Sequence, residues 1–69
     1  MRAMVRVRSI WPLAEIASAA GAGPSQPFGL GPTFVNDADE SGWGVLTVPN
    51  VAQEALDAAL AAWLEAAPQ

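Results

Sequence analysis

The chain of 69 residues contains no cysteine, no histidine and no lysine. Without cysteine it cannot form a disulfide, a thiolate metal site or a thiol nucleophile. Without histidine it lacks the commonest general base and a usual zinc ligand. Because these absences remove most enzyme chemistry, the sequence predicts a protein that is not an enzyme and carries no cofactor.

Positive charge is also scarce, since three arginines stand against seven acidic residues for a net charge of −4. No apolar run approaches the roughly 18 residues that a membrane span requires. Arginines interrupt the first eight residues, where a signal peptide would need its apolar centre. We therefore expect a soluble protein, synthesised in the cytoplasm, with no membrane partner.

The chain is rich in alanine. Hydrophobic residues make up 52% of the chain, and 15 of these hydrophobic residues are alanine. The larger apolar side chains that remain are enough for one thin core and rule out a wholly disordered chain. A chain of this length allows a single domain, residues 1–69, which buries only about 60% of its unfolded surface. We therefore expect its stability to be marginal.

Hydrophobic periodicity predicts five elements in the order β-α-β-β-α. Residues 3–9 alternate between apolar and polar, which is typical of a half-buried strand. Pro12 suits the first turn of a short helix that ends at Gly21, and two strands follow at 33–36 and 43–48. The predicted fold class is α+β, a three-stranded, mostly antiparallel sheet with both helices on one face.

The C-terminal helix, residues 51–66, has the strongest periodicity. Asn50 is suited to cap it, and Gln53 stands where a capping box requires Glu or Gln. The residues expected on its apolar stripe are Ala52, Leu56, Leu60, Trp63, Leu64 and Ala67. Leu60 is therefore expected in the core.

Residues 21–32 contain four glycines and three prolines, and such a segment cannot sustain a helix or a central strand. It nevertheless carries Phe28 and Leu30, which a purely flexible linker has little reason to hold. Two interpretations stay open: an ordered cover whose Phe28 fills the edge of the core, or a loop that binds a partner.

The acidic connector 37–42 ends in glycine and is typical of a hairpin turn. Asp37, Asp39 and Ser41 also match the first, third and fifth positions of a calcium loop. The match fails at the twelfth position, where Val48 stands in place of a bidentate glutamate. We therefore expect a solvated turn and no metal site, with these three residues only weak candidates for holding a cation.

Arg2, Arg6 and Arg8 carry all the positive side-chain charge and should share one face of the first strand. They could pair with the acidic turn or protect an edge strand from aggregation. They could instead bind an acidic partner, such as another copy of the chain, or form a nucleic-acid platform with Trp43. The net charge and the few phosphate contacts argue against nucleic acid as the partner.

The main functional hypothesis is an interface on the face of the sheet that the helices leave open, or along a free edge strand. Two short helices cover one face of three strands but hardly both, and the later strands carry apolar residues on both faces. The predicted partner-binding residues are Arg6, Arg8, Phe28, Leu30, Trp43 and Val45. Trp11 and Trp63 are expected in the core instead.

The sequence therefore predicts a non-enzymatic protein–protein interaction or structural module. An accessory subunit of a larger assembly, such as a homo-oligomer or a virus particle into which it is incorporated, fits this description. Two alternatives stay open: a small inhibitor of a host enzyme, and a small nucleic-acid-binding regulator that uses the N-terminal arginine strand.

Overall fold

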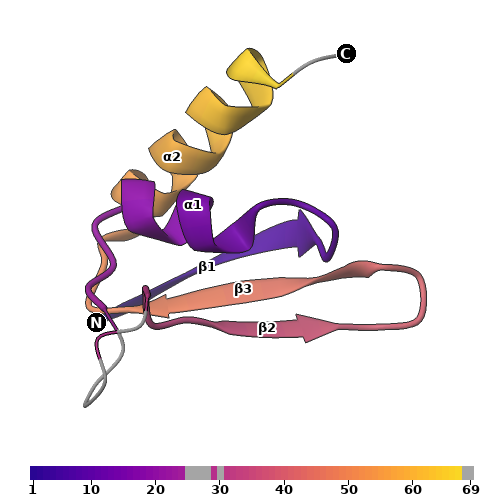
Figure 1. The fold of residues 1–69 in the computed structure, drawn as a ribbon, viewed down its shortest axis with the longest axis horizontal. Coiled ribbons are helices and arrows are strands. Elements are labelled where there is room, and N and C mark those ends of the chain that lie inside the picture. Colours follow the sequence, from indigo (N-terminus) through magenta and orange to yellow (C-terminus); the bar gives the residue numbers. More distant parts are fainter. Residues whose placement is uncertain (25–28, 30, 68–69) are drawn as a thin grey trace.

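The computed structural model describes residues 1–24, 29 and 31–67. The elements in chain order are β1 (Arg2–Arg8), α1 (Leu13–Ala19), β2 (Val35–Ala38), β3 (Trp43–Pro49) and α2 (Gln53–Ala66). β3 lies between β1 and β2 in a three-stranded sheet, and both pairings are antiparallel (Figure 1). The predicted α+β class is therefore confirmed.

The core lies between one face of the sheet and the two helices. Alternation along β1 turns Ala3 and Val7 inward, and β3 contributes Leu46 and Val48 to the same layer. The buried residues are Ala3, Val7, Leu13, Ile16, Ala17, Ala20, Leu46, Val48, Val51, Leu56 and Ala59. Among the residues that the structure describes, no polar or charged residue is buried, so burial of apolar side chains is the main contact between the helices and the sheet.

α2 begins two residues later than predicted, and the predicted cap is wrong. Asn50 has a φ of 60° and forms a turn, while the N-cap position belongs to Ala52, with no side-chain cap. The N–H of Asn50 donates to the carbonyl of Met1 (2.8 Å), which extends the pairing of β1 with β3. The chain must turn sharply there to bring Val51 into the core, and asparagine tolerates the left-handed conformation better than most residues.

Gln53 forms no capping box but binds the outer edge of β1. The N–H of Met4 donates to Oε1 of Gln53 (3.1 Å), and Nε2 of Gln53 donates to the carbonyl of Met4 (2.9 Å). The same nitrogen donates to Asp57 (3.0 Å). The side-chain amide thus takes the place of a neighbouring strand and blocks part of the edge against pairing with other chains.

Gln53→Ala is expected to lower the free energy of unfolding by about 1 kcal/mol, because two solvent-exposed hydrogen bonds to β1 are lost. Gln53→Glu replaces the donor nitrogen with a carboxylate oxygen that would lie against the carbonyl of Met4 and the carboxylate of Asp57, so it should be no more stable than Gln53→Ala. Urea unfolding followed by tryptophan fluorescence measures the difference. Equal midpoints for all three proteins would show that these bonds contribute nothing.

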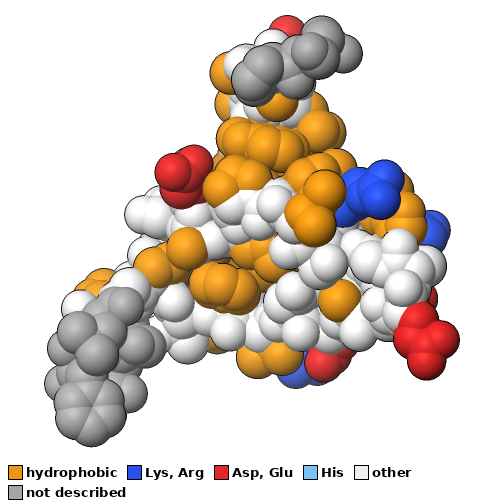
Figure 2. Space-filling view, turned by 45° about the vertical axis from the view of Figure 1, so that its right-hand side comes forward, with side chains coloured by type: hydrophobic (Ala, Val, Ile, Leu, Met, Phe, Trp, Pro, Cys, Tyr) orange, Lys and Arg blue, Asp and Glu red, His pale blue; other side chains and the backbone are white. Residues whose placement is uncertain are grey.

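α2 turns a narrower apolar stripe toward the core than predicted. Leu56 is 0% exposed and Ala59 is also buried, whereas Leu60 and Trp63 are only half-buried. Leu64 is 45% exposed, so its predicted place in the core-facing stripe is wrong. The C-terminal half of α2 rises beyond the sheet, and apolar side chains gather on it (Figures 1 and 2). No layer of the sheet therefore lies beneath the last turns.

The β2–β3 hairpin is shifted along the chain from its predicted position. β2 covers Val35–Ala38 rather than 33–36, and the turn comprises residues 39–42 rather than 37–42. Asp37 therefore belongs to a strand of the sheet. Its carboxylate adds a negative charge to the face of the sheet opposite the helices.

The glycine- and proline-rich segment 21–32 is closed at its neck. Gly21 ends α1 with a φ of 102°, as predicted for a helix stop. The N–H of Thr33 donates to the carbonyl of Gly23 (2.9 Å), and Pro24 and Pro32 form an isolated bridge. Phe28 and Leu30 lie outside the described residues, so both interpretations of this loop stay predictions.

Candidate functional site: the open face of the sheet

The register of the sheet orders the side chains opposite the helices into rows. Directly paired residues of neighbouring strands point to the same face. Val45 in β3 is paired with Arg6 of β1 on one side and with Asp37 of β2 on the other. This row therefore runs from a cation, across an apolar side chain, to an anion.

The row nearer the hairpin turn repeats this order. Trp43 is paired with Arg8, and its carbonyl accepts a hydrogen bond from the N–H of Asp39 (3.0 Å). Cationic side chains thus line the β1 side of the face, and carboxylates line the β2 side.

Apolar side chains on this face are exposed to solvent. At the other end of the face, Thr47 is paired with Met4 and with Val35, which are 49% and 56% exposed. The adjacent Val45 is 37% exposed. These three side chains form an exposed apolar area on the open face.

Trp43 holds the two nearest arginine side chains in place. The Cζ atoms of Arg6 and Arg8 lie 5.0 and 5.1 Å from the centre of its ring, within the range of cation–π attraction. A guanidinium group has five N–H donors, and a cation–π contact with an indole does not use all of them. The two arginines are therefore positioned, yet still able to bind carboxylates.

A row of three tryptophans joins the open face to the helical layer. The ring centres of Trp11 and Trp43 lie 5.8 Å apart, and those of Trp11 and Trp63 lie 5.2 Å apart. Trp11 and Trp63 pack against the core but stay half-buried, so their predicted core location is only partly met. Because Trp43 contacts Trp11 as well as the arginines, its removal would alter stability together with binding.

A hollow of about 280 Å³ lies on the acidic side of the face. Its lining residues are Arg6, Asp37, Asp39, Trp43, Gly44 and Val45. The carboxylate of Asp39 accepts hydrogen bonds from the hydroxyl and the N–H of Ser41, the latter at 2.9 Å. These bonds hold the pKa of Asp39 below its usual 3.8, so the carboxylate stays ionised and fixed in direction.

The predicted weak cation candidates are divided between the turn and β2 and do not lie in one calcium loop. Asp39 and Ser41 bond to each other within the turn, whereas Asp37 lies in β2. Across residues 1–24, 29 and 31–67, no three or more Asp, Glu, His or Cys side chains come together as metal ligands.

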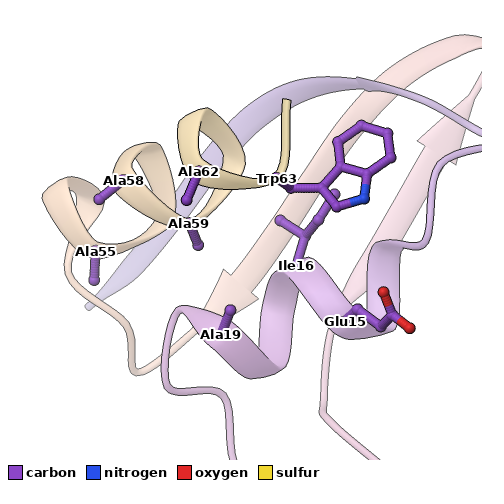
Figure 3. A pocket seen from close by; sticks show the side chains of 8 residues that line it. All are labelled: Glu15, Ile16, Ala19, Ala55, Ala58, Ala59, Ala62 and Trp63. Carbon is purple, nitrogen blue, oxygen red and sulfur yellow. The ribbon is translucent and has the colours of Figure 1, made fainter. Parts of the chain in front are cut away.

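A second hollow, which the sequence-based prediction missed, lies between α1 and α2 and has a volume of about 630 Å³. Its lining residues are Glu15, Ile16, Ala19, Ala55, Ala58, Ala59, Ala62 and Trp63. Alanines of α2 form one wall, with Ile16 and Ala19 of α1 across from them (Figure 3). The helical spacing of these alanines could have indicated the groove. Of the lining residues only Glu15 is charged, so few polar groups are present to orient a ligand.

The fold and the open face together define a small α+β protein with a sheet surface that is apolar at its centre and oppositely charged at its two sides. No family model matches the chain, and neither the curated proteins nor the solved structures give a match. Neither described helix has the length and apolar character needed to cross a membrane.

Proposed function

We propose that this protein is a non-enzymatic docking module that binds another protein chain through the open face of its sheet. The observation that carries the proposal is the exposure of Met4, Val35 and Val45 as neighbours on that face. Tryptophan and arginine beside apolar contact area are the residues enriched at protein–protein hot spots. An accessory subunit of a larger assembly would use such a face.

The charges of the open face favour a protein partner over a nucleic acid. Asp37 and Asp39 line the same hollow as Arg6, so a phosphate that approached this arginine would also meet two carboxylates. The net charge of −4 adds repulsion at longer range. A protein surface can offer both signs of charge together with apolar area.

A photocrosslinking amino acid at position 45, introduced in cells that produce the protein, tests this proposal. We expect a discrete crosslinked product that contains a second protein chain. The matched control carries the same probe at Ala61, an exposed alanine of α2, and should give no such product. Equal products from both positions, or none from position 45, would refute the proposed docking face.

A further inference from the structure

We infer that the partner on the open face is a second copy of this chain, stacked face to face on the first about a two-fold axis that runs along β3. The inference rests on the proposed function, because it names the occupant of the same face. Its basis is that each row of side chains, read from β1 to β2, is complementary in charge or polarity to the same row read from β2 to β1.

Consider a two-fold axis that is parallel to β3 and lies midway between two stacked sheets. Rotation about this axis keeps the position of each row along the strands, and it places β1 of one copy over β2 of the other. Arg6 and Asp37 occupy the two ends of one row. In the stacked pair, Arg6 of each copy therefore faces Asp37 of the other. Because the axis is two-fold, this contact is made twice.

The other rows match in the same way. Arg8 faces the side of the other copy on which Asp39 lies, and Met4 faces Val35, so charge meets opposite charge and apolar meets apolar. Val45, at the centre of its row, lies next to the axis and faces Val45 of the other copy. The exposed apolar side chains of both copies are thus removed from water together.

The alternative face-to-face axis, perpendicular to the strands, is disfavoured by charge. It would place β1 over β1 and β2 over β2, so that arginines would face arginines and Asp37 would lie over the acidic side of its own copy. Like charges that oppose each other directly are destabilising. The distribution of charge therefore selects the axis along β3.

The arginines are suited to cross the space between the sheets. Stacked sheets lie about 10 Å apart, a gap that a long arginine spans better than a short aspartate. The guanidinium groups of Arg6 and Arg8 already lie over the ring of Trp43, so less side-chain entropy is lost when they bind.

The size of the face predicts a weak, reversible dimer. Three strands spaced about 4.8 Å apart and at most seven residues long cover on the order of 300 Å² per copy. This area is below that of stable interfaces, and its Arg–Asp contacts lie at the rim. Salt screens these contacts, and it also screens the repulsion between two chains that each carry a net charge of −4, so the affinity should change little with salt.

A charge exchange between Arg6 and Asp37 tests the inference, with the mass in solution measured by light scattering at about 0.15 M ionic strength and up to about 1 mM protein. The wild type should dimerise. Arg6→Asp and Asp37→Arg alone should each dimerise at least about tenfold more weakly, because each places like charges opposite one another. An equimolar mixture of the two should regain the wild-type affinity, since every opposed pair is then of unlike charge.

Two controls keep the experiment decisive. Glu54→Arg makes the same change of charge as Asp37→Arg on an exposed part of α2 and should leave dimerisation unchanged. Met4→Glu mixed with Val35→Arg tests the same axis through another row, so the test survives if Arg6→Asp fails to fold. Circular dichroism establishes that each variant is folded.

A monomeric wild type would overturn the inference, as would folded single variants that dimerise normally or mixtures that do not recover. If the wild type is monomeric while position 45 crosslinks to a different protein, only the second copy is excluded and the proposed function stands. If the wild type is monomeric and position 45 gives no crosslinked product, both the inferred dimer and the proposed docking function are refuted.

Discussion

Leu56→Ala is expected to lower the free energy of unfolding by about 3 kcal/mol, within the range for truncation of a buried leucine. Leu56 is 0% exposed and belongs to the cluster that joins α2 to the sheet. A chain of 69 residues is stabilised by only about 3 to 10 kcal/mol. The variant should therefore be largely unfolded at a temperature where the parent is folded, as measured by circular dichroism during heating and by urea titration.

Leu64→Ala is the matched control, because it makes the same chemical change on the same helix. Leu64 is 45% exposed on the projecting part of α2, so its truncation should change the stability by less than about 0.5 kcal/mol. Periodicity alone places Leu56 and Leu64 on one stripe and predicts similar losses. Equal losses in the experiment would therefore contradict the arrangement of α2 described above.

Gly44→Ala is expected to lower the free energy of unfolding by about 2 kcal/mol or more, because a side chain there meets backbone atoms of β2. An added Cβ would lie 2.6 Å from Cα of Ala38 and 2.7 Å from the carbonyl carbon of Asp37, and would overlap the carbonyl oxygen of Asp37. These atoms cannot move away without breaking the β2–β3 pairing. Urea unfolding measures the loss, and the same variant should also lose dimerisation because β2 carries the acidic side of the face.

Gly23→Ala is the control for the glycine effect. An added Cβ at this position meets nothing within 4 Å, so the stability should change by less than about 0.5 kcal/mol. A Gly44→Ala protein as stable as Gly23→Ala would show that the strands do not approach as closely at Gly44 as the structure has them.

The type and order of the elements could be predicted because they depend on short-range periodicity. Alternation along β1 and the helical spacing of residues 51–66 each bury one side of their own element, whatever lies opposite. The start of α2 could not be predicted in the same way. Asn50 and Gln53 have the right local chemistry for a cap. In the structure, however, Asn50 forms a sharp turn and Gln53 hydrogen-bonds to the backbone of Met4 at the edge of β1.

The candidate site was predictable only in part. Alternation places Arg6 and Arg8 on one face of their strand, and the same argument applies to Trp43 and Val45. The inclusion of Asp37 was not predictable, because a run of acidic residues favours a turn until the extent of strand pairing is known. The groove between the helices depends likewise on how α1 and α2 pack.

By itself, the sequence determined the inventory of chemistry and the alternation of inward and outward side chains along β1 and β3, because both depend on residue type and on the backbone period. Only the tertiary structure decided that β3 lies between β1 and β2, that Gln53 binds the backbone of Met4, and that cations and carboxylates occupy opposite sides of one face. These features join residues that are far apart in the chain. They are selected by packing and pairing of the whole molecule, which no local pattern contains.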